Sequence, residues 1–375
     1  MQPPLMSITL ARDLRKTPAL VEAWEDLAAQ ALEPNVFYEH WMLLPALRAY
    51  GAAPDARVAL VWRGATAGGA PILAGLMPLA FVTRSGRLSV SAARLWQHPH
   101  CYLGTPLIRA DCARECIGAL LQWLRGLGWA ETLELPSLSA DGPFHRLLLE
   151  CCQGLRLRTW RTQAYTRGLW LQAGNGVRSP ASAVSGPLRR CLRRKQRRLA
   201  ECGSLSHPAP RTGEELERWI EEFLRVEAQG WKGARGTALA CSEAGRAFFA
   251  QVIAGAFRRR RLLTLGLDCN GEPVARRCAF LAREGAFAFK TTYAERFAAF
   301  SPGALLEIDN LSQLAGLPQV RWMDSCAGPD NLLINRIANG RRTIDGLTIA
   351  VRPVGTLALT AQRLLHRTNQ WLSRR

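Results

Sequence analysis

The sequence lacks the features that would place the chain in a membrane, in an export pathway or around a metal ion. It has no apolar run of the roughly 18 residues that a transmembrane helix needs, and its N-terminus has no basic-then-apolar secretion signal. Its 11 cysteines are scattered, without the paired CxxC motifs of a zinc site. It contains no recognised DNA-binding motif and no RNA-binding aromatic signature. We therefore expect a soluble cytoplasmic protein without a metal cofactor.

Acidic residues are scarce relative to basic ones. The 375 residues include 49 Lys and Arg against 30 Asp and Glu, a formal net charge of +19. An excess of this size indicates an anionic partner. The densest basic tract runs from Arg189 to Arg198. Its ordinary interpretation is a solvated linker helix, and the functional one is contact with nucleic acid, an anionic membrane surface or a phosphate-bearing ligand.

Apolar residues are plentiful enough, at 48%, for a sizeable core, and at about 150 residues per domain the length predicts two domains. Strand and helix patterns are mixed in both halves; residues 262–293, for example, have the pattern of a three-stranded meander with glycine-containing turns. We predict an α/β fold of the mixed α+β kind. Two modules, 1–172 and 188–375, each have a mixed, largely antiparallel sheet flanked by helices, and a linker rich in Gly, Ser and Pro joins them over residues 173–187.

The segment from residue 285 to 311 has the pattern of an anion site. An alternating strand presents Lys290 and Tyr293 near its end, and Ser301, Pro302 and Gly303 then open an apolar helix. Serine is a preferred helix N-cap, proline suits the first turn, and glycine lets a ligand approach the backbone. Free amides and the helix dipole attract anions at such a start. A purely structural helix start is the alternative.

These motifs resemble the GNAT acyltransferase superfamily, and more specifically the CelD-like, cellulose-biosynthesis-associated group of bacterial acetyltransferases. The resembling segments are LRRKQRRLAECG (192–203), FLRVEAQGWKGARGTAL (223–239), FAFKTTYAERFAAFSPGALL (287–306) and MDSCAGPDN (323–331), with NVFYEHWMLLPAL (35–47), LAGLMPLAF (73–81) and DGPFHRLL (141–148) in the first half. The sequence departs from the family at the usual phosphate-binding glycines, at Ala294 and in the tyrosine-free segment 329–337.

The resemblance implies two GNAT-like modules in tandem, with the acyl-CoA site in the C-terminal one. It implies that Ser301, Gly303 and the adjoining Ala304 hold the pyrophosphate of acetyl-CoA or another acyl-CoA. It also implies that Trp231 and Lys232 lie near the acceptor in the cleft. Lys290 is a further candidate for binding a cofactor phosphate or an anionic substrate. The expected reaction is transfer of the acyl group to an amine.

This reaction needs a group that takes the amine proton and another that protonates the departing thiolate or stabilises the oxyanion. The candidate bases are Glu227, Asp324 and Glu307, of which Asp324 ends a short strand. Tyr293 is the candidate acid, since a phenol has a pKa near 10. Each also has an ordinary structural interpretation: a solvated loop carboxylate, a side chain complementing a helix dipole, or an aromatic ring packed on the sheet.

Three functions remain open. The first is acyl transfer from acyl-CoA to a small-molecule or glycan-precursor amine, in line with the cell-envelope and polysaccharide associations of the resembling group. The second is a Fem-type transferase, which shares the tandem layout but takes its acyl group from aminoacyl-tRNA. The third is a non-enzymatic protein that binds anions or nucleic acid on a GNAT-like fold.

Overall fold

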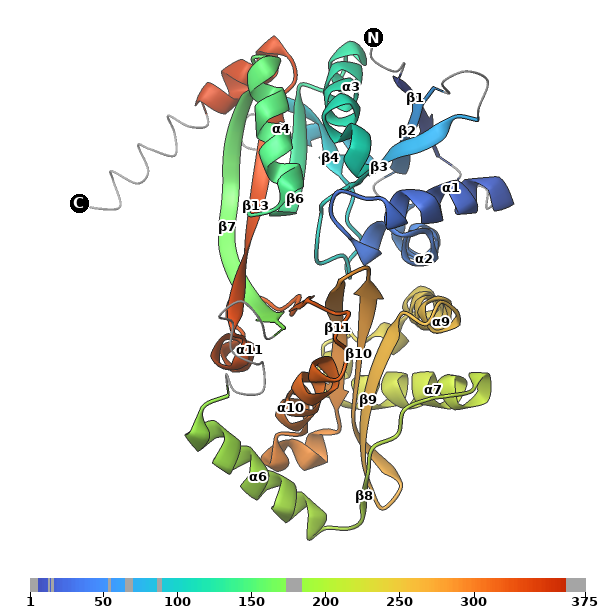
Figure 1. The fold of residues 1–375 in the computed structure, drawn as a ribbon, viewed down its shortest axis with the longest axis vertical. Helices are drawn as coiled ribbons and strands as arrows, with labels where there is room; N and C mark the ends of the chain where they lie inside the picture. The colour runs from blue at the N-terminus through green and yellow to red at the C-terminus, as the bar shows by residue number, and fades with distance from the viewer. Residues whose placement is uncertain are drawn as a thin grey trace, which may run out of the picture. The chain divides into compact units, whose positions relative to one another are not determined.

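A computed structural model of the chain describes residues 6–12, 14, 17–52, 55–64, 70–85, 90–172 and 184–361. Within these residues, strands form one mixed sheet in the order β1-β2-β3-β4-β6-β13-β7-β12-β11-β10-β9-β8, and β5 pairs with β3 (Figure 1). Helices accompany the strands throughout, so the predicted mixed α/β class is confirmed. No helix in the described ranges is long and apolar enough to cross a membrane.

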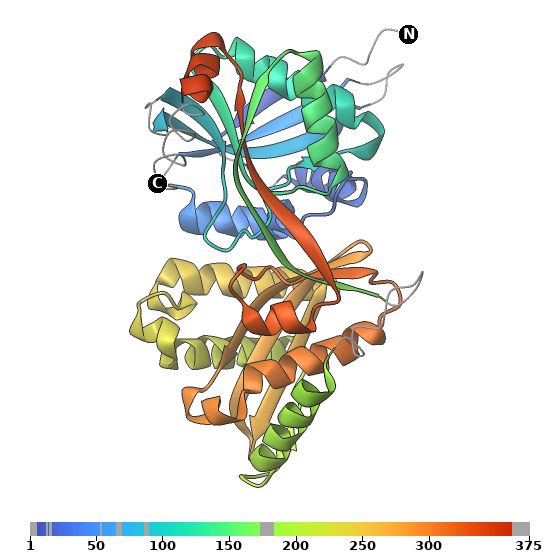
Figure 2. The same ribbon diagram turned by 90° about the vertical axis from the view of Figure 1, so that its left-hand side faces the viewer.

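The chain divides into two compact units. One comprises Met1–Tyr165 together with Thr343–Arg375, and the other is the continuous segment Thr166–Arg342. This division differs from the predicted modules because the final strand belongs to the first unit: Ile344 to Ala350 pair antiparallel with Ser139 to Thr132. Of the predicted linker, residues 173–183 lie outside the described residues. The strands that connect the units, β7 and β13, are neighbours in the sheet and run side by side in Figure 2.

The first unit is built on antiparallel pairs, with one parallel contact between β4 and β6. Its amphipathic helix α3 buries Cys116, Ile117, Leu120, Leu121 and Leu124, the stripe expected of a helix packed on a sheet. Its elements are β1 (Met6–Ala11), α1 (Pro18–Ala29), α2 (His40–Tyr50), β2 (Ala56–Arg63), β3 (Ile72–Ser85), β4 (Val90–Leu95), β5 (Leu107–Ile108), α3 (Ala113–Gly126), β6 (Thr132–Ser139), α4 (Pro143–Gly154), β7 (Arg158–Leu171, shared with the second unit) and β13 (Gly340–Ala350, also shared). Residues 353–361 are helical.

The second unit contains the predicted meander. Strands β9, β10 and β11 pair antiparallel, and the residues with left-handed backbone in their turns are Asn270, Gly271 and Arg283. Its elements are α6 (Gly186–Ala200), β8 (Leu205–Ser206), α7 (Gly213–Gln229), α8 (Trp231–Ala234), α9 (Glu243–Arg258), β9 (Leu262–Cys269), β10 (Glu272–Ala282), β11 (Gly285–Tyr293), α10 (Pro302–Ala315), β12 (Trp322–Asp324) and α11 (Leu332–Ile337). Short 3-10 helices lie at Leu239–Cys241 and Glu295–Phe300.

Successive arginines on β10 show which helices cover which face of this sheet. The Arg276 guanidinium contacts Glu222 of α7 at 2.6 Å, whereas Arg277 contacts Glu307 of α10 at 3.0 Å. Because neighbouring strand residues point to opposite faces, α7 and α10 lie on opposite faces of the meander. We call these the α7 face and the α10 face (Figure 1).

Candidate functional site

The start of α10 is built from a serine in an unusual backbone conformation. Ser301 has φ 52° and ψ 53°, and its side chain does not cap the helix as the sequence predicts. Instead, its Oγ accepts a hydrogen bond from Lys195 Nζ of α6 at 2.5 Å. The backbone carbonyl of Ser301 accepts from the amides of Ala304 (2.9 Å) and Leu305 (3.2 Å). Pro302 has no N–H, so Gly303 has the one amide of this turn that no acceptor in the described residues occupies.

Helix α6 places two cationic side chains beside this turn. Lys195 contacts Ser301 directly, and the guanidinium of Arg198 lies 6.0 Å from the ring centroid of Phe300. The first turn of α10 has no acidic residue, so no side-chain carboxylate there competes with a bound anion for the positive end of the helix dipole. We call the group Lys195, Ser301 and Gly303 the anion turn. A free amide, a dipole and a cation together are what a phosphate needs. The predicted role of Ala304 is weakened, since its N–H is already bonded.

Glycine at position 303 is not required by the fold. A Cβ built on Gly303 would lie 3.7 Å from Tyr293 Cδ1 and 3.9 Å from Thr291 Cγ2, which are ordinary contact distances. The same distances show that Tyr293 and Thr291 lie on the α10 face of β11, next to the anion turn. Gly233, in the Trp231–Gly233 motif, differs: a Cβ there would meet the carbonyl of Ala228 at 1.7 Å. That glycine is required for the turn between α7 and α8.

The side chain of Lys290 lies on the opposite face of β11 from the anion turn, although the sequence assigns it to cofactor binding. The charged groups that act on it are Lys232 and Glu227, from α8 and α7. Glu227 is buried, and its Oε1 and Oε2 accept hydrogen bonds from Lys232 Nζ and the Leu239 amide, both at 2.9 Å. We call Glu227, Lys232 and Lys290 the lysine cluster. It belongs to the α7 face, so the structure joins Lys290 to predicted catalytic and substrate residues instead.

A β-bulge and burial explain the chemistry of Lys290. Cys278 pairs with Lys290 and Ala279 with Ala288, so Phe289 is an extra residue opposite β10. Such bulges re-aim the neighbouring side chains. Burial, assisted by the positive charge of Lys232 and opposed by Glu227, lowers the pKa of Lys290 from 10.5 to about 8. A lysine of this pKa can both take up and release a proton near neutrality.

The environment of Trp231 is cationic and open. Its side chain is 50% exposed, and the Arg235 guanidinium lies 5.1 Å from the ring centroid. Lys232 Nζ lies 5.9 Å from the same centroid. The ring therefore extends the lysine cluster towards solvent, in the position of a surface that a substrate can contact.

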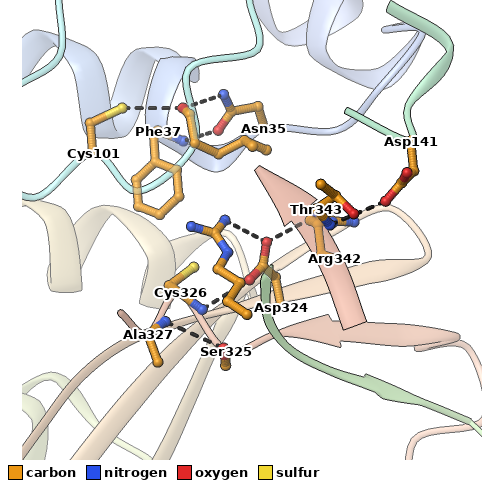
Figure 3. A network of polar contacts seen from close by, with 12 residues as sticks. Asn35, Phe37, Cys101, Asp141, Asp324, Ser325, Cys326, Ala327, Arg342 and Thr343 are labelled. Carbon is orange, nitrogen blue, oxygen red and sulfur yellow. Dashed lines mark hydrogen bonds and ion pairs between the residues drawn. The ribbon is translucent and has the colours of Figure 1, made fainter. Parts of the chain in front are cut away.

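Asp324 is an anchor between strands in this structure. Its buried carboxylate accepts from Arg167 Nη2 of β7 at 2.6 Å, from Arg342 Nη1 at 2.7 Å and from the Cys326 amide at 2.9 Å. Figure 3 shows the carboxylate between Arg342 and the Cys326 backbone. Burial raises the pKa of Asp324, but the two arginines outweigh it and hold the pKa below its usual value. A carboxylate held in this way is a poor proton acceptor.

The structure also places Asp324 far from Tyr293, the residue predicted to act with it as the catalytic acid. Asp324 pairs with Phe287 of β11, and Tyr293 lies six residues further along the same strand. At about 3.3 Å per residue the two positions are separated by roughly 20 Å. They therefore cannot act on one thioester from opposite sides. Glu307, the third candidate base, is buried and ion-paired to Arg277 at 3.0 Å. The sequence has no signal for Arg167, the partner of Asp324 that lies 157 positions earlier in the chain.

Comparison with known proteins agrees with this architecture. Residues 187–331 match the family model of an acetyltransferase (GNAT) domain. The crystal structure of FemX is similar over 92% of this chain and 98% of that chain, with a TM-score of 0.56 and 9% identity. A conserved protein of unknown function from Bacteroides thetaiotaomicron is similar over 92% of this chain and 100% of that chain, with a TM-score of 0.55 and 12% identity. No curated protein sequence matches the chain. The anion turn and the lysine cluster both lie within the matched residues.

Proposed function

We propose that the protein transfers an acyl group from a CoA thioester to an amine. The observation that supports this best is the arrangement along β11. A cation-flanked helix start follows the strand on the α10 face, and a lysine with a pKa of about 8 lies within the strand on the α7 face. The family match of residues 187–331 supports the same reaction class.

The anion turn is the proposed site of the donor's pyrophosphate. The Gly303 amide donates to a phosphate oxygen, and Lys195 supplies the countercharge from α6. Charge-assisted hydrogen bonds of this kind are roughly twice as strong as neutral ones. Ser301 holds Lys195 Nζ within reach before the ligand arrives. The site needs no metal ion, because the cation comes from the chain itself.

The donor's pantetheine arm is proposed to follow the free edge of β11. Pairing with β12 covers Gly285 to Phe287 alone, so on that edge the remainder of β11 has no strand partner among the described residues. Backbone groups there can bond the amides of an extended arm, as a neighbouring strand would. This route leads from the anion turn back along the strand to the bulge at Phe289, and so to Lys290.

Lys290 is the proposed proton carrier. The amine nitrogen attacks the thioester carbonyl, the C–N bond forms as the C–S bond breaks, and one proton passes from nitrogen to Lys290 Nζ. The resulting ammonium returns this proton to the thiolate, which leaves as the free thiol. Lys232, held by Glu227, helps to keep the pKa of Lys290 low. Tyr293 is not the proton donor in this scheme, since it lies beside the phosphates on the α10 face, whereas Lys290 lies on the α7 face.

The test is a thiol-release assay with acetyl-CoA and a panel of amines, with amine-bearing glycan precursors first because of the resemblance to the CelD-like group. Lys290→Gln is expected to lower kcat by about 10²–10⁴-fold with little change in acetyl-CoA affinity. Lys290→Arg keeps the charge but cannot lose its proton, so it should be equally impaired. Full activity in Lys290→Arg would contradict the proton-carrier role. Absence of acetyl-CoA binding to the wild type would contradict the proposed function itself.

One observation favours a second candidate, a transferase that takes its acyl group from aminoacyl-tRNA. The outer face of α6 presents Arg190, Arg194 and Arg197, all exposed and without a carboxylate partner in the described part of the chain. Nucleic-acid phosphates are suitable ligands for such a surface. Purified, nuclease-treated protein that binds tRNA but not acetyl-CoA would favour this candidate. Binding of either ligand without any transfer would favour a non-enzymatic anion-binding protein.

A further inference from the structure

A groove between α6 and α10 lies directly beside the anion turn. It has a volume of about 500 Å³, within the roughly 300–1,000 Å³ common for small-ligand sites. Its near end includes Leu305, one helical turn or about 6 Å beyond Ser301. On the opposite wall, Gln196 immediately follows Lys195. A ligand whose phosphate rests on the anion turn therefore reaches the groove with its next few atoms.

The chemistry of the groove is divided between floor and rim. The floor is apolar, with Leu192 from α6 and Leu305 and Leu311 from α10. The rim contains the guanidinium groups of Arg189 and Arg193 against one carboxyl, that of Asp309. The Asp309 carboxyl lies 3.8 Å from His207, and burial raises its pKa. The lining therefore suits a flat, weakly polar ring that bears a negative group at its edge.

We propose that this groove binds the 3′-phosphoadenosine end of the CoA donor, with Arg193 as the partner of the 3′-phosphate. The inference rests on the proposed function, because it places the far end of the same donor. In CoA the ribose that bears the 3′-phosphate and adenine is attached directly to the pyrophosphate, so the adenosine must lie beside whatever holds that pyrophosphate. The groove is the apolar hollow next to the anion turn, and its rim has the matching charge. Arg193 thereby becomes a specificity residue for CoA over donors that lack the 3′-phosphate.

The experiment compares CoA with dephospho-CoA by isothermal titration calorimetry. The wild type should bind CoA roughly ten- to a hundred-fold more tightly, the range expected for hydrogen bonds to a charged group. Arg193→Ala should abolish this preference by weakening CoA alone. Arg194→Ala is the matched control: it removes the same charge one residue further along α6, from a side chain that does not line the groove. It should leave the preference intact.

A second variant tests the floor without disturbing the core. Ser312 is exposed at the far end of the groove, so Ser312→Trp should fold normally and cover the space with an indole. It should weaken CoA and dephospho-CoA by the same factor. Equal affinity of the wild type for the two ligands, or equal losses for both in Arg193→Ala, would overturn the inference while leaving the donor site in place. If neither ligand binds the wild type, the donor site and this inference are both overturned.

Discussion

Lys290 is expected to titrate near pH 8, and its two charged neighbours are expected to move that pKa in opposite directions. Burial and the charge of Lys232 lower the pKa, and Glu227 raises it. At pH 7, a pKa of about 8 leaves about one Lys290 side chain in ten neutral, against about three in ten thousand for an ordinary lysine. The difference in free base is therefore about 300-fold.

Two substitutions separate the electrostatic contributions to this pKa. Lys232→Met removes the neighbouring positive charge and releases the charge of Glu227, so the pKa of Lys290 should rise. Glu227→Gln removes the compensating carboxylate, so the pKa should fall below that of the wild type. Arg235→Met is a suitable control, since Arg235 lies in the same segment but is not among the groups that shift Lys290. It should leave the pKa unchanged.

The assay is competitive labelling with a limiting amine-reactive reagent between about pH 6 and pH 11, a range that brackets both pKa values, with the Lys290 peptide quantified by mass spectrometry. Burial slows the reagent but does not move the midpoint of the titration. A wild-type midpoint near the ordinary value of 10.5 would refute the reasoning. Shifts of the same sign in both variants would refute the electrostatic part of it.

The lowered pKa also has a consequence for stability. Between about pH 8 and pH 10.5 the unfolded chain binds a proton at Lys290 that the folded protein does not, so folding stability rises with pH across this window. Below pH 8 Lys290 is protonated in the folded state, and the free-energy cost of burying this charge is fully present, at most about 3 kcal/mol for a pKa shift of this size. Lys290→Met should therefore stabilise the protein at pH 7 and lose this advantage above pH 10.5. Urea unfolding at both pH values measures the difference.

Three further predictions concern the anion turn, the buried carboxylate of Asp324 and the exposed arginines of α6. Lys195→Met should weaken acetyl-CoA binding by about tenfold, whereas Gly303→Ala should change neither the fold nor, because its Cβ points at Tyr293, the affinity; calorimetry and thermal unfolding distinguish the two. Asp324→Asn should destabilise the fold by about 3–5 kcal/mol, because the buried guanidinium group of Arg167 and the partly buried one of Arg342 lose their counterion. Since the folded pKa of Asp324 is lowered, its contribution is complete above the unfolded pKa and is lost as the pH falls through the folded value, which urea unfolding against pH can follow. Serine at Arg190, Arg194 and Arg197 together should reduce the slope of log affinity for RNA against log salt by about 2–3 units; an unchanged slope would mean that these arginines are merely solvated.

Local patterns made the meander and the helix start predictable. The turn at Asn270 and Gly271 has the left-handed backbone that its residues favour, and α10 begins at Pro302 as the first-turn proline indicates. These features depend on neighbouring residues alone, so a single sequence contains the information. The alternation of Gly285 to Tyr293 likewise predicted a strand.

Features that depend on distant parts of the chain were not predictable in this way. Strict alternation puts Lys290 on the same face of β11 as Ala286 and Ala288, but the bulge at Phe289 turns Lys290 to the α7 face and is not visible in the residue types. In the sequence Asp324 resembles a free carboxylate at a strand end, but in the structure it accepts a hydrogen bond from Arg167, 157 positions away. Ser301 resembles a simple N-cap until Lys195 occupies its oxygen. In each case the role is decided by a partner that no local pattern indicates.

The return of the chain through β13 sets an order for biosynthesis. Strand β13 lies between β6 and β7 in the sheet, yet about 170 residues are translated after β7 before its first residue emerges. At roughly 5–20 residues per second that interval is on the order of ten to thirty seconds. Throughout it, β6 and β7 each have a strand edge without its final neighbour, and such edges pair readily with the wrong partner. The continuous segment Thr166–Arg342, by contrast, is complete as soon as it leaves the ribosome. The unit that begins the polypeptide is thus the last to be finished.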